Sequence, residues 1–249
     1  MMLEVDAGNS RLKWRLVDVG GSCINCIDSG ALNYDASLVE FLTTDFRFAD
    51  VNCLLVSDVS KNELVHELCN IYNKCLSAKN VFIASAQKKL NGVQFVYQDI
   101  DRLGVDRCLG MVAAYEKFNA GVLVVDCGSA ITADVVSAEG VHIGGCIIPG
   151  FNLLRSSLSH GTSDILLGGE VESFCGLGSS TIECVENGLA VMVRASLEAF
   201  VAIAKEHKVE VFVLTGGDAV LVEKLGVKNY IICEDLVFKG LEIVSPFTF

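Results

Sequence analysis

Two segments of the chain carry an aspartate, a glycine and a small polar residue in the same order. The first is Asp-Ala-Gly-Asn-Ser at residues 6–10, and the second is Asp-Cys-Gly-Ser at residues 126–129. A glycine at this point lets the backbone turn tightly and bring its N–H groups to an anion. The aspartate itself would meet phosphate through Mg²⁺ or its water shell, while Lys13 adds a positive charge. These residue types suit the binding of a polyphosphate.

The two segments lie at matching positions within a longer repeat. Asp6 aligns with Asp126 and Gly8 with Gly128, and each segment is flanked by two apolar stretches. One such segment alone would be interpreted as an ordinary turn, because Asp and Gly are common turn formers. Two copies favour a pair of hairpins that face each other across a cleft and hold one polyphosphate.

A third segment, Gly-Val-Asp-Arg at residues 104–107, could serve the acceptor of a phosphoryl transfer. It leads into a helical pattern, so Asp106 would lie where a helix N-terminus has free N–H groups. Arg107 offers a fork of donors that suits a carboxylate. Asp106 has two interpretations: it caps the helix, or it accepts the proton of a substrate hydroxyl. The residue types leave both open.

The Thr-Gly-Gly-Asp segment at residues 215–218 follows a buried strand pattern. Its adjacent glycines permit a close approach of the backbone, such as an adenine or ribose requires. A plain loop explains the segment nearly as well, so it only supports the nucleotide-binding interpretation.

The elements that must position these residues alternate between strands and helices. Hairpins are expected within residues 3–17 and 124–136. Further strands are predicted at 51–57, 81–84, 141–148 and 209–214, and helices at 61–76, 106–118 and 181–206. This order predicts an α/β protein with mixed sheets and two related halves. We place the halves at residues 1–117 and 118–249.

Composition narrows the class of protein. The chain has 249 residues, 51% hydrophobic and 20% charged, with a formal net charge of −12. That charge argues against non-specific nucleic-acid binding, which requires many Lys and Arg. The opening residues lack the basic start and apolar stretch of a secretory signal, and no run is expected to span a bilayer. We therefore expect a cytoplasmic protein whose 11 cysteines are reduced thiols in the core or at the surface.

The ordered set of motifs closely resembles the type III pantothenate kinases. The matching segments are residues 6–13, 104–107, 126–132, 144–150, 178–181 and 235–241, which together span almost the whole chain. The resemblance implies an actin-like (ASKHA, ribonuclease H-like) fold with duplicated domains and mixed central sheets. It implies a kinase that uses ATP with Mg²⁺, and K⁺ or NH₄⁺, to convert pantothenate to 4′-phosphopantothenate, the first step of coenzyme A biosynthesis. Family members are homodimers with the acceptor pocket near the subunit interface.

The resemblance also assigns roles by position. Asp106 would be the catalytic base, and Asp126 would bind the monovalent cation. The residues expected to line the ATP phosphates are Asp6, Ala7, Gly8, Asn9, Ser10, Arg11, Leu12 and Lys13, with Ser129 on the other side. Those expected to contact pantothenate are Tyr97, Gly104, Val105, Asp106, Arg107 and Thr181.

The chain departs from the family at two positions, where Ser10 and Ser129 replace the usual Thr. Both keep the hydroxyl and lose a methyl group, so the loops lose some rigidity while the chemistry remains. Two alternatives stay open. One is another kinase of this fold, acting on a sugar or acetate. The other is a non-catalytic regulatory protein, against which the acidic charge and the lack of a helix-turn-helix pattern argue.

Overall fold

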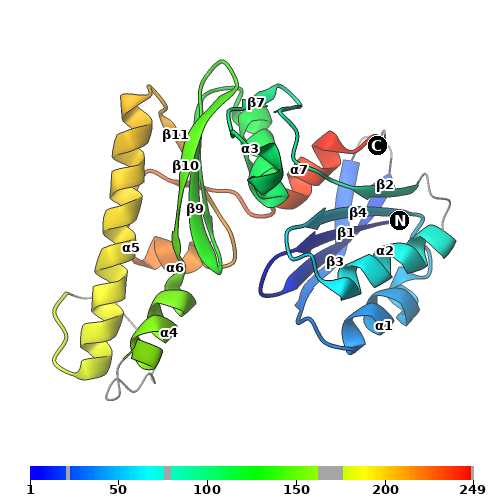
Figure 1. The fold of residues 1–249 in the computed structure, drawn as a ribbon, viewed down its shortest axis with the longest axis horizontal. Coiled ribbons are helices and arrows are strands. Elements are labelled where there is room, and N and C mark those ends of the chain that lie inside the picture. The colour runs from blue at the N-terminus through cyan, green and yellow to red at the C-terminus, as the bar shows by residue number, and fades with distance from the viewer. Residues whose placement is uncertain (21–22, 76–79, 162–175, 248–249) are drawn as a thin grey trace. The chain divides into compact units, whose positions relative to one another are not determined.

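A computed structural model describes residues 1–20, 23–75, 80–161 and 176–247. The chain forms two compact units. The first comprises Met1–Ala113 together with Leu236–Phe249, and the second comprises Ala114–Asp235 (Figure 1).

The first unit is built on a five-stranded mixed sheet with the order β3-β2-β1-β4-β5. The central strand β1 pairs antiparallel with β2 and parallel with β4, so the predicted first hairpin is confirmed. The strands are β1 (Met2–Ala7), β2 (Leu12–Gly20), β3 (Cys23–Leu32), β4 (Cys53–Asp58) and β5 (Val81–Ile83). A smaller hairpin pairs β6 (Lys89–Leu90) with β7 (Val93–Phe95).

Helices cover both faces of this sheet, because its side chains alternate between two apolar clusters. On one face lie α1 (Ser37–Thr44) and α2 (Glu63–Cys75), which pack on Leu3 and Val5 of β1. On the other face Met2 packs with the start of α3 (Val105–Phe118) and with α7 (Leu236–Val244). Short 3₁₀ turns at Phe46–Phe48 and Ile100–Arg102 complete the unit. Asp6 lies on the same face as Met2, and therefore on the side of α3 and α7.

The second unit repeats this plan. Its strands run in the order β10-β9-β8-β11-β12, with β8 antiparallel to β9 and parallel to β11. They are β8 (Val122–Cys127), β9 (Ala130–Val136), β10 (Val141–Pro149), β11 (Val211–Thr215) and β12 (Ile231–Ile232). The helices are α4 (Phe151–Gly161), α5 (Thr181–Glu206) and α6 (Ala219–Lys224). Since β8 takes the place of β1, the predicted duplication and the mixed α/β class are confirmed.

The long helix α5 lies along one face of the second sheet (Figure 1). It is long and apolar enough to cross a membrane by length and composition alone, with 39% of its most apolar window buried. This corrects the expectation that no run of the chain is long enough. A core helix passes the same test, and α5 packs Val193, Leu197 and Phe200 into the core of the unit. We interpret it as a core helix.

The C-terminal helix α7 belongs to the first unit, whereas residues 236–249 were expected in the second half. It buries Phe238 and Leu241 against the first sheet, and a methyl group at Gly240 would overlap the backbone of Leu109 in α3. Glu242 also reaches Arg15 of β2 with a 2.5 Å ion pair. The ion pair joins two residues that are 227 positions apart in the chain, which sequence periodicity cannot reveal.

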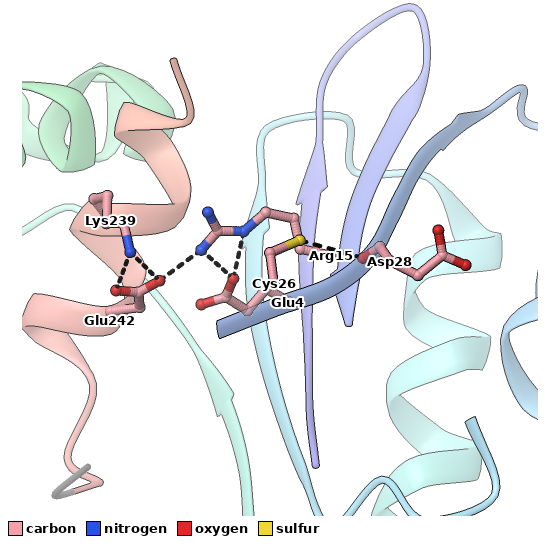
Figure 2. A network of polar contacts seen from close by, with 6 residues as sticks. All are labelled: Glu4, Arg15, Cys26, Asp28, Lys239 and Glu242. Atoms are coloured by element: carbon pink, nitrogen blue, oxygen red, sulfur yellow. Dashed lines mark hydrogen bonds and ion pairs between the residues drawn. The ribbon is translucent and has the colours of Figure 1, made fainter. Parts of the chain in front are cut away.

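A charge network with a buried centre at Glu4 and Arg15 also holds α7 against the first sheet (Figure 2). Arg15 donates to Glu4 through Nε at 2.8 Å and through Nη2 at 2.6 Å, and its guanidinium lies 4.7 Å from the ring centre of Phe238. Lys239 in turn binds Glu242 at 2.9 Å. Glu4 is fully buried, and this burial raises its pKa from 4.5 to about 7 despite Arg15.

Glu4 should make the free energy of unfolding fall as the pH rises from 4.5 to 7. Because its pKa is higher in the folded state, folded Glu4 holds a proton between pH 4.5 and 7 that the unfolded chain has released. The stability that protonated Glu4 contributes is complete below pH 4.5 and is lost above pH 7. We expect Glu4→Gln, which cannot titrate, to remove about 2 kcal/mol of the stability loss between pH 5 and 8. Urea unfolding of both proteins at pH 5 and at pH 8 measures this difference in the free energy of unfolding. Parallel pH profiles for the two proteins would contradict this role.

The nine cysteines among the described residues are all free thiols. Burial raises the pKa of Cys53 and of Cys69 to about 11. The described residues contain no cluster of three or more His, Cys, Asp or Glu side chains able to hold a metal ion. The side chains of the other two cysteines, Cys23 and Cys175, lie outside the described set. For these nine residues the expected core or surface thiols are confirmed.

Candidate active site

At the end of β1, Asp6 stands in the middle of a row of three polar side chains. Lys13 of β2 pairs with Asp6 on one side, and Ser57 of β4 pairs with it on the other. Paired residues in a sheet present their side chains on the same face. The row therefore combines a cation, a carboxylate and a hydroxyl where β1 gives way to the Asp-x-Gly turn.

Tyr34 holds the turn that follows Asp6. Its hydroxyl donates to the carbonyl oxygen of Gly8 at 2.6 Å, and its half-buried ring lies near Ser60 and Asp58. Asp58 in turn accepts from the Ser60 hydroxyl at 2.7 Å, at the start of the turn into α2. The first hairpin turn is therefore tied to the end of β4, and its conformation does not depend on Gly8 alone.

The Gly-Val-Asp-Arg segment lies at the same end of the first unit. The N–H of Val59, just after β4, donates to the carbonyl of Ala7 at 3.0 Å. The side chain of Val59 is also next to Gly104, where an added methyl group would be 3.7 Å from Val59 Cγ1. Val59 thus lies between the phosphate turn and the acceptor segment.

Asp106 lies in the first turn of α3, which begins at Val105. Its Oδ1 accepts the N–H of Arg107 at 2.8 Å, and a methyl group on Gly104 would overlap this oxygen. Arg107 also reaches Tyr97: its Nη1 is 3.3 Å from the hydroxyl, and its guanidinium is 5.8 Å from the ring centre. The loop carrying Tyr97 is held by Lys88, which donates to the Tyr97 carbonyl. Five of the six predicted acceptor residues therefore lie together: Tyr97, Gly104, Val105, Asp106 and Arg107.

In the second unit, Asp126 occupies the position that Asp6 has in the first. It pairs with Thr132 of β9 and with Thr215 of β11, so the row here holds one carboxylate between two hydroxyls. A threonine of this row stands where the first row has Lys13. Such oxygen ligands suit a hard cation.

Two glycines allow other loops to approach the second hairpin turn closely. Gly216 has φ +96°, and a methyl group there would overlap the Cys127 carbonyl and Asp126 Oδ1. A methyl group on Gly150 would likewise overlap the carbonyl of Gly128. The N–H of Asp218 donates to the Cys127 carbonyl at 2.9 Å. Residues 216 and 218 thus closely approach Asp126–Cys127 of the protein itself, and the approach of this segment to an adenine or ribose stays a prediction.

Gly216→Ala should disturb this arrangement. The side chain would be strained at φ +96° and would push the loop away from Asp126, so we expect a loss of about 1–3 kcal/mol of stability. Affinity for ADP should fall as well. Thermal unfolding and calorimetric titration with ADP measure the two effects. Gly188→Ala in α5 is the control, because no atom lies within 4 Å of its added methyl group. If both variants behave alike, the packing of Gly216 is not critical.

The remaining predicted residues fall into two groups. The side chains of Ala7, Leu12 and Val105 are buried in apolar clusters, so only their backbones can face a ligand. The side chains with exposed surface are Asn9, Ser10, Arg11, Ser129 and Thr181, the last at the start of α5 behind the Ser180 N-cap.

The donor set fits magnesium held jointly with substrate phosphates. Mg²⁺ is usually bound by one or two carboxylates, several waters and phosphate oxygens. The first unit offers Asp6 beside the hydroxyl of Ser57, and the second offers Asp126 between two threonines. Both sets consist of hard oxygen ligands.

Sequence reasoning missed three contributors to these rows and turns. Ser57 could have been noticed as the hydroxyl that ends the apolar run Leu54–Val56. Thr215 belonged to a noted turn, but its pairing with Asp126 depends on strand register. No sequence pattern indicates a role for Tyr34, since it lies 26 residues along the chain from Gly8, the residue whose carbonyl it binds.

A family model and curated relatives that match this chain carry the same description. Residues 2–203 match the family model described as type III pantothenate kinase. A type III pantothenate kinase of Pseudomonas aeruginosa (strain LESB58) is 38% identical over 256 residues, which cover 99% of each chain. That of Pseudomonas syringae pv. syringae (strain B728a) is 36% identical over 255 residues, again 99% of each.

Two solved structures share the fold. One, from Campylobacter jejuni, is described as a Baf family transcriptional activator; it has a TM-score of 0.63 and 23% identity, covering 97% of this chain and 96% of that one. The other, described as a 2-dehydro-3-deoxygalactonokinase from Sinorhizobium meliloti, has a TM-score of 0.54 and 12% identity, covering 97% of each. At such identities the likeness concerns the fold alone. The fold is the duplicated actin-like one, as predicted.

Proposed function

Because the chain belongs to the type III pantothenate kinase family, we propose that it transfers the γ-phosphoryl group of ATP to the primary hydroxyl of pantothenate. The product would be 4′-phosphopantothenate, at the entry to coenzyme A biosynthesis. The observation that carries the proposal is the convergence of Asp106, Arg107 and Tyr97 at the end of the first unit that also holds the Asp6 turn.

Asp106 is the proposed general base. It accepts the proton of the pantothenate hydroxyl while that oxygen attacks phosphorus, and the N-terminus of α3 favours its negative charge. Arg107 pairs with the pantothenate carboxylate, and its contact with Tyr97 orients the guanidinium. Gly104 leaves room beside the Asp106 carboxylate, because any side chain there would overlap it. Val105 contributes its backbone only, and Thr181 is proposed as a further pantothenate contact.

The two hairpin turns are the proposed nucleotide site. Residues 6–13 bind the ATP phosphates through backbone N–H groups, short polar side chains and the Lys13 ammonium, and Ser129 binds them from the second hairpin. Asp6 would hold Mg²⁺ through its water shell, and Asp126 would hold K⁺ or NH₄⁺ with the threonine hydroxyls. When bound, these cations neutralise phosphate charge. An acidic chain with few local cations requires that help.

Release of ADP by the purified protein tests the acceptor. With ATP, Mg²⁺ and K⁺, we expect turnover that depends on pantothenate and is absent with hexoses or acetate. Turnover with a sugar or acetate, but not with pantothenate, would establish the competing kinase. Nucleotide binding without turnover on any acceptor would favour the regulatory alternative.

Dimer formation and a cytoplasmic location remain predictions from the family. Size-exclusion chromatography with light scattering checks the first: a homodimer should have twice the mass of the 26.7 kDa chain.

A further inference from the structure

The hydroxyl of Ser57 is buried without a hydrogen-bond partner among the residues that the structure describes. Ser57 is 0% exposed, and its Oγ contacts no donor or acceptor at hydrogen-bonding distance. A buried polar group left unpaired destabilises the folded state, and such groups are rare in native proteins. A ligand that turns a neighbouring acceptor toward this hydroxyl when it binds would therefore stabilise the folded state.

The strand register shows where that partner is. Ser57 is the residue of β4 directly paired with Asp6 of β1, and their side chains share the face of the sheet that also bears α3. Further along β4, the residues on this face are Cys53 and Leu55, both part of the apolar cluster. Ser57 is thus the one β4 hydroxyl placed beside the Asp6 carboxylate.

We propose that Ser57 is a positioning residue for the magnesium–nucleotide complex, acting through Asp6. Its Oγ–H donates to one carboxylate oxygen of Asp6 when the nucleotide binds, and this contact turns the other oxygen toward the hydrated metal. Groups that orient a metal-binding carboxylate in this way commonly change metal affinity by 10- to 100-fold. The inference rests on the proposed function for the nucleotide site but is independent of the acceptor.

The internal duplication supports the assignment. In the second unit, Thr215 of β11 holds the same register position beside Asp126 that Ser57 holds beside Asp6, and it too is buried. A hydroxyl therefore stands next to the strand-end aspartate in both halves. The neighbour on the other side differs, being Lys13 in the first half and Thr132 in the second.

Calorimetric titration with ADP, in Mg²⁺ and separately in EDTA, tests the proposal without turnover. We expect Ser57→Ala to weaken ADP binding about tenfold in Mg²⁺ and to leave binding in EDTA nearly unchanged. Ser57→Thr keeps the hydroxyl and should restore most of the affinity. Without ligand, Ser57→Ala should unfold at the same or a higher urea concentration than the wild type, because it removes an unpaired buried hydroxyl.

The control is Cys53→Ala, a buried substitution in the same strand but away from Asp6, which should bind ADP like the wild type. Two results would overturn the proposal. One is wild-type ADP affinity for Ser57→Ala in Mg²⁺. The other is an equal loss in Mg²⁺ and in EDTA together with lower stability, which indicates a packing role.

Pantothenate takes no part in this titration, so its outcome is separate from that of the acceptor assay. If the wild type fails to phosphorylate pantothenate while Ser57→Ala loses magnesium-dependent ADP affinity, the proposed acceptor is wrong and the role of Ser57 stands. If the wild type phosphorylates pantothenate while Ser57→Ala binds ADP normally, only the role of Ser57 is wrong.

Discussion

Asp106→Asn is expected to lower kcat by about 10²–10⁴-fold while leaving the fold and the KM for ATP nearly unchanged. A positioned general base typically contributes a factor of this size, and asparagine cannot accept the proton. Asparagine matches aspartate in shape, and its side-chain oxygen can still accept the N–H of Arg107 that Asp106 accepts at 2.8 Å. The local structure at the start of α3 should therefore persist. Steady-state kinetics with saturating pantothenate, together with thermal unfolding, measure the two parts of this prediction.

Asp101→Asn is the matched control. Asp101 lies five residues earlier in the exposed turn Ile100–Arg102, so the same chemical change there should leave kcat unaffected. Near-normal turnover of Asp106→Asn would show that Asp106 only stabilises the helix end. A large loss of stability in this variant would indicate the same structural role.

Asp126→Asn is expected to raise the K⁺ concentration needed for half-maximal activity by at least tenfold. Asp126 lies between Thr132 and Thr215, so it is the charged member of its row. Replacing it with a neutral amide leaves only neutral oxygens in the row to hold the cation. Activity measured against K⁺ at fixed, saturating Mg²⁺ reports this change.

The duplication of the chain provides a comparison within the same protein. Asp6→Asn alters the equivalent carboxylate, which stands next to Lys13 and Ser57. It should shift the dependence on Mg²⁺ and leave the K⁺ response largely intact. If Asp126→Asn keeps the wild-type K⁺ response, or if both variants change both responses equally, the separate roles of the two aspartates are wrong.

Much of the fold could be predicted because it is encoded locally. The two hairpins follow from apolar runs that flank an Asp-x-Gly turn, and α3 and α5 begin within one residue of their predicted starts. Both units show the expected mixed sheet because the same local pattern occurs twice. The family assignment likewise rests on short motifs in a fixed order, and the comparisons confirm it.

The features that escaped prediction depend on contacts between distant residues. The position of α7 in the first unit results from the pairing of Glu242 with Arg15 and from the packing of Phe238, which no local pattern reveals. The proximity of Ser57 to Asp6 depends on the register between β1 and β4, which no local pattern encodes. The roles assigned to individual site residues stay predictions until the variants are measured.

The most direct test of the account is identification of the phosphorylated product by ³¹P NMR and mass spectrometry. Purified protein, ATP, Mg²⁺, K⁺ and pantothenate should yield ADP and a phosphate monoester on the primary hydroxyl of pantothenate in equal amounts. Replacing K⁺ with Na⁺ should sharply reduce both. ADP without phosphorylated pantothenate, or product formed equally fast in Na⁺ alone, would contradict the account.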